Sequence, residues 1–221
     1  MISSTRKLHP LEKASDGPIA LLINRPVSRR ISAPLASAGV SPTVATFMAM
    51  AIGGLAAAAF ALQVWWLGGV LLQLSSIFSG VDGEIARRTH RESRYGDFLD
   101  TMVDRLTEYG AFLAIAFGLH DAWDNWAWIA GLLAVGGSFM LASASEKYRS
   151  TMHENYPKRR YEPLFAYLAS GRDVRIFVLM LGAIAATWSV DVMFWTVVGL
   201  AALLHANFVW RVLLLRSRMA A

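Results

Sequence analysis

The sequence contains no cysteine, which excludes both a disulfide framework and a thiolate metal site. Charged residues are scarce as well, because they make up 17% of the 221 residues, whereas soluble domains carry about a quarter. No P-loop and no nucleophile elbow occurs, and no internal repeat indicates a transporter built from inverted halves. The chain consists largely of apolar sequence, with 55% hydrophobic residues.

Long apolar segments are the main feature of the chain. A helix needs about 20 mainly apolar residues to cross the hydrocarbon core of a membrane. The first such segment has a clear start, because Ser41 can cap a helix that has Pro42 in its first turn. The predicted spans are residues 44–62, 65–80, 96–119, 126–145, 174–188 and 192–215. We therefore expect an all-α, polytopic membrane protein with six transmembrane helices.

The basic residues sort to one side of these six spans. All 21 Lys and Arg residues lie in the N-terminal segment, in or near the second and fourth connections, or at the C-terminal end. The opposite side has only acidic residues and tryptophans: Asp121, Asp124, Asp191, Trp123, Trp126, Trp128, Trp188 and Trp195. This is the positive-inside pattern with an aromatic belt. It predicts an integral protein of the inner or cell membrane with both termini in the cytoplasm.

The net charge of +5 has two possible explanations. A basic chain can bind nucleic acid, but in a membrane protein the same excess follows from loop asymmetry and anionic headgroups. The long apolar segments favour the membrane reading, so we expect membrane lipids and no nucleic acid among the partners.

The N-terminal segment does not resemble a signal peptide, because charged residues and Pro10 and Pro18 interrupt it. Arginines alternate with apolar residues over 25–35, which predicts a short amphipathic juxtamembrane helix on the membrane surface; a solvated tail is the alternative. The predicted regions are a cytoplasmic N-terminal segment (1–43), a six-helix transmembrane domain (44–215) and a cytoplasmic tail (216–221).

Carboxylates gather in residues 82–104, DGEIARRTHRESRYGDFLDTMVD. Asp100 and Asp104 are four residues apart and share a helix face, and the short connection after Asp82 lets the two helices pack as antiparallel neighbours. Carboxylates near a membrane core are costly unless they are paired or bind metal, and oxygen ligands suit Mg²⁺, Mn²⁺ or Ca²⁺. From these residues alone, structural ion pairs with arginines and a cation or proton path remain alternatives.

The stretch resembles the signature of the CDP-alcohol phosphatidyltransferase family, D-G-x2-A-R-x8-G-x3-D-x3-D. Every spacing matches, on Asp82, Gly83, Ala86, Arg87, Gly96, Asp100 and Asp104. The resemblance covers about residues 41–215. Residues 24–28 and 171–175 also resemble, more weakly, the subgroup that includes inositol-phosphate-transferring enzymes.

The resemblance implies an enzyme that moves a phospho-alcohol group from a CDP-linked donor to a hydroxyl acceptor and releases CMP. The donor is CDP-diacylglycerol or a CDP-polyol, in phospholipid or inositol-phosphate-type synthesis, and the family is commonly dimeric. Mg²⁺ or Mn²⁺ is the implied cofactor, held by Asp82, Asp100 and Asp104. Asp104 is the expected general base, with Asp100 able to share that role. The implied nucleotide-binding residues are Gly83, Ala86, Arg87 and Gly96.

Ser79 departs from the family pattern, which usually has an aspartate three residues before Asp82. A hydroxyl is a poor substitute for a carboxylate ligand. The site is then expected to hold one metal weakly, to use a water molecule instead, or to recruit Glu84 or Asp97. A catalytically impaired family member that binds CDP-alcohol or metal is the main alternative function, and a cation-coupled transporter is another.

Four basic residues flank the fourth and fifth spans on the side of the signature: Lys147, Arg149, Arg172 and Arg175. They are candidates for holding an anionic acceptor such as a sugar or inositol phosphate. Contact with anionic lipid headgroups is the alternative. The run Lys158-Arg159-Arg160 is interpreted as a lipid-surface patch.

Overall fold

Every regular element in the part of the chain that the structure describes is a helix, which confirms the all-α prediction. The structure is a computed structural model that describes residues 16–168 and 171–219. Its elements are η1 (Ala20–Asn24), α1 (Arg25–Ser37), α2 (Pro42–Ala61), α3 (Trp65–Thr89), α4 (Arg94–Trp123), α5 (Asn125–Met152), α6 (Lys158–Tyr161), α7 (Pro163–Leu168), α8 (Arg172–Ala185) and α9 (Val190–Met219).

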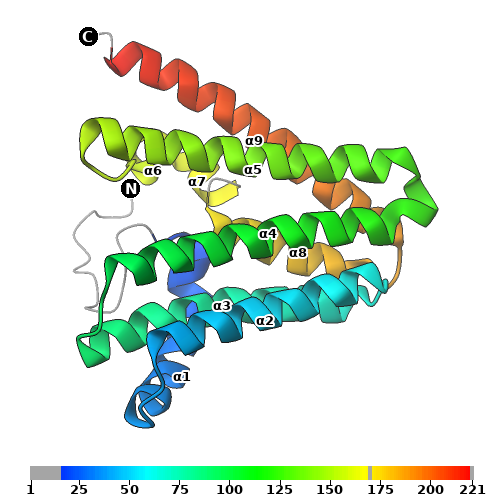
Figure 1. The fold of residues 1–221 in the computed structure, drawn as a ribbon. Coiled ribbons are helices and arrows are strands. Elements are labelled where there is room, and N and C mark those ends of the chain that lie inside the picture. Colours follow the sequence, from blue (N-terminus) through cyan, green and yellow to red (C-terminus); the bar gives the residue numbers. More distant parts are fainter. Residues whose placement is uncertain (1–15, 169–170, 220–221) are drawn as a thin grey trace.

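Six of these helices, α2, α3, α4, α5, α8 and α9, lie over the six predicted spans and run side by side (Figure 1). The chain reverses between successive long helices. The α3–α4 junction and the ends of α5 and α9 therefore lie at one end of the bundle, on the left in Figure 1. The connections that carry the basic residues thus share one end.

Three helices in the described part of the chain are long and apolar enough to cross a membrane by length and composition: Pro42–Ala61, Asn125–Met152 and Val190–Arg216. The helices over the other three predicted spans, α3, α4 and α8, do not meet this criterion. α3 and α4 carry the charges of the signature, and α8 has only 14 residues.

α2 starts as predicted. The side chain of Ser41 accepts a hydrogen bond from the Val44 N–H at 3.3 Å, and Pro42 occupies the first turn. Gly53 lets α2 approach α4, because a Cβ at that position would lie 2.6 Å from Thr107. Gly53 therefore serves packing within the bundle.

The apolar core runs along the middle of the bundle and includes Phe60 of α2, Phe112 of α4, Ile176 of α8 and Met193 of α9, each of them fully buried. Lipid tails are as apolar as these side chains, so close van der Waals packing between the helices, and not exclusion of water, holds a spanning bundle together. The charged signature lies beyond one end of this core.

The predicted amphipathic segment is helical, but its buried face is polar. Arg25, Ser28 and Ser32 of α1 are buried against α3, and Ile31 and Leu35 pack beside them. At the other end of the chain, α9 continues as a helix into the stretch that the sequence assigned to a tail. The expectations for residues 1–15 and 220–221 lie outside the described residues.

Candidate functional site

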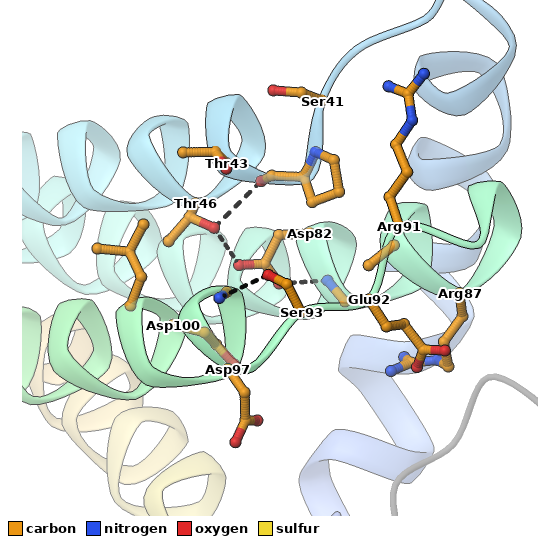
Figure 2. Close-up of a pocket in the computed structure, with 15 residues that line it drawn as sticks. Ser41, Thr43, Thr46, Asp82, Arg87, Arg91, Glu92, Ser93, Asp97 and Asp100 are labelled. Carbon is orange, nitrogen blue, oxygen red and sulfur yellow. Dashed lines mark hydrogen bonds between the residues drawn. The ribbon is translucent and has the colours of Figure 1, made fainter.

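Six of the seven signature residues line one cavity of about 330 Å³ (Figure 2). We call it the junction cavity because it lies between the start of α2, the end of α3 and the start of α4. Its lining residues are Ser41, Pro42, Thr43, Thr46, Asp82, Gly83, Ala86, Arg87, Arg91, Glu92, Ser93, Gly96, Asp97, Leu99 and Asp100. All four predicted nucleotide-binding residues are among them.

Local sequence explains how α3 and α4 meet at this cavity. α3 ends at His90, which adopts a left-handed conformation with φ of 52°. α4 begins after Ser93, whose hydroxyl accepts a hydrogen bond from the Gly96 N–H at 3.0 Å. This tight reversal confirms the short connection predicted from the sequence and places Asp82 and Asp100 on the same cavity.

Asp82 is buried and hydrogen-bonded at both carboxylate oxygens. The Thr46 hydroxyl of α2 donates to Oδ2 at 2.6 Å, and the Gly83 N–H donates to Oδ1 (Figure 2). These donors fix the carboxylate and support its charge. Thr46 was not predicted as a site residue, because nothing in its local sequence indicates a contact with α3.

Ser79 lies between the other two carboxylates of the signature. Its hydroxyl oxygen is 2.8 Å from Asp104 Oδ1 and 3.3 Å from Asp100 Oδ1. A hydroxyl has one proton to donate, so the shorter contact to Asp104 is the stronger one. The serine therefore occupies the position of the missing acid as a hydrogen-bond donor.

Asp104 is turned away from the junction cavity and paired with a cation. Arg172 Nη1 of α8 lies 2.6 Å from Asp104 Oδ1, and Asp104 lines the next two cavities but not the first. Among the residues that the structure describes, no three His, Cys, Asp or Glu side chains are close enough to share a metal ion. Of the three predicted ligands, Asp82 and Asp100 share the junction cavity, and Asp104 lies beyond Ser79.

The second cavity, of about 250 Å³, is rich in positive charge, and we call it the basic cavity. It is lined by Asp97, Thr101, Asp104, Arg105, Ser138, Leu141, Ala142, Ser145, Glu146, Arg149, Asn155, Tyr156, Lys158, Arg172 and Arg175. Five of these side chains are cationic and three are carboxylates. Such a wall attracts an anion.

A third cavity, of about 230 Å³, adjoins the basic cavity and shares Asp104, Arg105, Lys158 and Arg172 with it. We call it the N-terminal cavity, because much of its wall comes from the start of the described chain. Its remaining lining residues are Asp16, Gly17, Ala20, Asn24, Arg25, Ser28, Ser76, Ser79, Gly80, Gly171 and Asp173.

The four predicted acceptor residues occupy different environments. Arg172 and Arg175 line the basic cavity, but Arg175 is buried and bound to Glu108 by contacts of 2.6 and 3.0 Å. Arg149 lines the same cavity and pairs with Glu146 at 2.8 Å on its exposed side. Lys147 is exposed and lies outside the lining of this cavity. Arg172 is thus the predicted residue closest to the signature.

Lys158 lies in the wall of the basic cavity and not on a lipid-surface patch, which corrects that interpretation. Burial lowers the pKa of Lys158 to about 8, and the positive charges of Arg175 and Arg211 act in the same direction. Arg105 joins it in this wall. Helical periodicity could not predict Lys158, because the path of an irregular connection is set by its tertiary contacts.

The connection that carries Lys158 is anchored by a buried ion pair. Arg211 of α9 binds both oxygens of Glu162 at 2.7 and 2.9 Å, and Tyr156 donates to the same carboxylate at 2.6 Å. From the sequence, Arg211 counts only among the basic residues at the C-terminal end. The structure shows that Arg211 fixes the wall of the basic cavity.

The proposed recruitment of Glu84 as a replacement ligand is wrong. Glu84 is fully buried on the opposite side of α3 and accepts hydrogen bonds from Ser28 and Ser32 of α1. Its position two residues after Asp82 turns it to another helix face. Asp97, the other candidate, lines both the junction cavity and the basic cavity.

Comparison with known sequences gives consistent matches. Residues 40–215 match the model of the CDP-alcohol phosphatidyltransferase family. The chain is 35% identical over 191 residues to a bifunctional IPC transferase and DIPP synthase from Archaeoglobus fulgidus, covering 86% of this chain and 37% of that protein. It is 34% identical over 113 residues to an archaetidylinositol phosphate synthase from Pyrococcus horikoshii, covering 51% of this chain and 57% of that protein. The resemblance to the inositol-phosphate subgroup is thereby confirmed.

Solved structures of phosphatidylinositol phosphate synthase from Mycobacterium tuberculosis share the fold. The form with CDP-DAG bound gives a TM-score of 0.66 at 18% identity, covering 86% of this chain and 92% of that chain. The form with manganese and citrate gives 0.65 at 17% identity, covering 87% and 88%. The chain spans only 37% of the bifunctional relative, so the activities of that whole protein are not transferred to it directly.

Proposed function

The chain belongs to the CDP-alcohol phosphatidyltransferase family, and we propose that it transfers a phospho-alcohol group from a CDP-linked donor to an anionic acceptor. The observation that carries this proposal is that two cavities of opposite character meet at one set of carboxylates. The junction cavity holds six signature residues, and Asp104, the seventh, lines the basic cavity beyond Ser79. Donor and acceptor then meet at Asp100 and Asp104.

We place the donor in the junction cavity. Gly83, Ala86 and Gly96 leave room for the nucleotide to lie against the helix backbones, and Arg87 supplies charge-assisted hydrogen bonds to the diphosphate. The relative from Mycobacterium tuberculosis was solved with CDP-DAG bound, which supports a CDP-linked donor. CDP-diacylglycerol and a CDP-polyol are both candidates for this chain.

Mg²⁺ or Mn²⁺ is the expected cofactor, on the side of Asp82 and Asp100. Both carboxylates line the junction cavity, and the hydroxyl oxygens near them belong to Thr46 and Ser79. This all-oxygen donor set suits a hard divalent cation, and the mycobacterial relative was solved with manganese. When bound, such an ion neutralises the charge of the diphosphate and of the leaving group. Asp104 is the third predicted ligand.

The chain's own residues then account for the proton transfer. Asp104 is the expected general base, because it lines the basic cavity and Arg172 holds its Oδ1 at 2.6 Å. It takes the proton of the acceptor hydroxyl while that oxygen bonds to the phosphorus nearest the donor's alcohol. The bond from this phosphorus to the bridging oxygen of the diphosphate breaks, and CMP leaves with the electron pair.

We propose an inositol phosphate or a similar sugar phosphate as the acceptor. The surplus of cationic side chains in the basic cavity supports an anion there, with Arg172 in contact with Asp104 and Arg105 and Lys158 in the same wall. Synthases whose names contain inositol phosphate occur among the relatives. Arg149, Arg175 and Lys147 remain weaker candidates for the same task.

We also propose that all six long helices span the membrane, with both termini and the site on the cytoplasmic side. The basic connections lie at one end of the bundle, as the positive-inside pattern requires (Figure 1). α3 and α4 carry most of their charges toward the end that encloses the polar site, and Glu84 and Glu108 are paired with arginines inside the protein, which a spanning helix tolerates. A homodimer is the expected assembly.

One observation favours a second function, that of a non-catalytic family member. Ser79 replaces an acid, and within the described residues the three signature aspartates do not form a single group that could hold a metal. A protein of this kind would bind CDP-alcohol without releasing CMP.

The test is CMP release by the purified protein with Mn²⁺ or Mg²⁺. CDP-diacylglycerol and CDP-inositol are supplied separately, each with glycerol phosphate, serine, inositol or inositol phosphate. Acceptor-dependent CMP release supports the transferase and identifies its substrates. Binding of a CDP-alcohol without CMP release from any pair supports the non-catalytic alternative instead.

A further inference from the structure

The side of α3 that faces away from the junction cavity is joined to α1 by buried polar contacts. Glu84 is fully buried there, and Ser28 and Ser32 donate to its two oxygens at 2.6 and 2.7 Å. Arg25 Nη1 approaches the same carboxylate at 3.2 Å. A buried carboxylate is costly unless it is both paired and hydrogen-bonded, and Glu84 is both.

Arg25 connects this carboxylate to the segment that precedes α1. Its Nε and Nη2 donate to the two oxygens of Asp16 at 2.9 and 2.8 Å, and its Nη1 donates to the Gly80 carbonyl at 3.3 Å. A Cβ at position 80 would lie 2.9 Å from Arg25 Nη1, so a side chain there would displace the guanidinium. One guanidinium therefore ties the N-terminal segment to α3.

The same segment is tied to the start of α8. The Ala20 N–H donates to Asp173 Oδ2 at 2.9 Å. Asp173 directly follows Arg172, whose guanidinium lies 2.6 Å from Asp104 Oδ1. Contacts therefore continue from the buried pair, through the N-terminal segment, to the arginine that holds the predicted general base.

Residues 16–25 also form a wall of the N-terminal cavity, where Asp16, Gly17, Ala20, Asn24 and Arg25 are lining residues. That cavity opens onto the same Asp104 and Arg172 that line the basic cavity. A displaced wall would therefore change the shape of the acceptor side and leave the junction cavity intact.

We propose that the Arg25–Glu84 pair is a positioning device for the acceptor. It holds residues 16–25 in place as a wall and, through Asp173, fixes the start of α8 where Arg172 meets Asp104. Glu84 lines none of the three cavities, and it reaches the N-terminal cavity through Arg25 and Ser28, which both line it. The inference rests on the proposed function, because it requires an acceptor to bind on this side of Asp104.

Glu84→Gln tests the pair with an almost isosteric change that removes one charge. Because the wall loses its anchor, KM for inositol phosphate should rise about tenfold, as for other supporting residues of a site. KM for the CDP-alcohol and the affinity for Mn²⁺ should stay within about twofold, since the junction cavity is unchanged. Ser32→Ala is the matched control, because it removes one hydrogen bond to Glu84, keeps the charge pair and lies outside the lining of the three cavities.

Asp16→Asn is the second variant, because it loosens the wall while the Arg25–Glu84 pair stays intact. Positioning predicts weaker acceptor binding in this variant. If Asp16 instead faces the bound acceptor directly, the variant should bind the acceptor more tightly, because a negative charge is removed from an anion-binding cavity. The sign of the change therefore separates the two roles, and it remains readable if Glu84→Gln does not fold.

Calorimetric binding of inositol phosphate to the intact protein provides a readout that does not depend on turnover. We expect the Kd to rise about tenfold in both variants, while circular dichroism shows that Asp16→Asn keeps its helical fold. Unchanged acceptor affinity in both variants, or equal losses of donor and acceptor affinity, would overturn it even if the wild type releases CMP. Failure of the wild type to bind inositol phosphate would overturn this inference, and the absence of CMP release with any acceptor would overturn the proposed function.

Discussion

The junction cavity and the basic cavity adjoin at Asp97, which lines both, but they differ in charge and in the helices that form them. Four carboxylates and two arginines line the first cavity, whereas five cations and three carboxylates line the second. An acidic wall suits a cation and a diphosphate bound through it, and a basic wall suits an anion directly. The difference assigns the donor to one cavity and the acceptor to the other.

The two cavities also differ in sequence range. All signature residues of the junction cavity lie within residues 82–100, on two successive helices. The cations of the basic cavity come from residues 105–175 and from α4, α5, α6 and α8. A local sequence motif therefore predicts the donor side. The acceptor side cannot be predicted in this way, because its residues come together only when distant helices pack.

The largest expected effect follows removal of the carboxylates at the boundary. Asp104→Asn should lower CMP release by about a thousandfold, because it removes the proton acceptor, and Asp100→Asn should have a similar effect through the cation. Initial rates at saturating substrates measure this loss. Unchanged thermal unfolding would show that the variants stay folded. Near-normal activity in either variant would contradict the catalytic role assigned to that aspartate.

Replacing one arginine in each cavity should weaken the binding of one substrate and leave that of the other unchanged. Arg172→Gln should raise KM for the acceptor by about thirtyfold, corresponding to about 2 kcal/mol for a lost buried charge pair. Arg87→Gln is the matched variant and should raise KM for the CDP-alcohol instead. Equal effects of both variants on both substrates would mean that the cavities do not divide the substrates.

The sequence predicted the helices and the donor side well, for physical reasons. Helices lie over all six predicted spans, although three of those helices lack the apolar length of a membrane span, and the spacing of Asp82 and Asp100 predicted that they share one site. The contact between Arg172 and Asp104 spans 68 positions of the chain and depends on how α8 packs. No periodicity encodes such a contact, and the same holds for Thr46 and Asp82.

Restoring the missing acid should change metal binding at the signature carboxylates. Ser79→Asp should tighten Mn²⁺ binding about tenfold, because a carboxylate replaces a neutral oxygen beside Asp100. Titration calorimetry without substrate measures this affinity, and Ser79→Asn is a control of similar size without the charge. Identical Mn²⁺ affinity in Ser79→Asp and the wild type would place Ser79 outside the metal site.

The smallest expected effect is a pH dependence confined to the basic cavity. Burial lowers the pKa of Lys158 to about 8, so the side chain loses its positive charge as the pH rises through that value. KM for an anionic acceptor should therefore rise about fivefold from roughly pH 7 to pH 9, while KM for the donor stays level.

Lys158→Arg is the matched control for this titration, because arginine stays charged throughout the range. The variant should show a flat acceptor KM over the same interval. A rise as steep as in the wild type would assign the titration to another group.

The most direct test compares inositol phosphate with inositol as acceptors for the purified protein, supplied with a CDP-linked donor and Mn²⁺. The two acceptors differ only in the phosphate that the basic cavity is proposed to bind. If the basic cavity binds the phosphate, CMP release should depend on inositol phosphate and be low with inositol. Arg172→Gln should lose this preference. Equal use of both acceptors by the wild type would contradict the proposed role of the basic cavity.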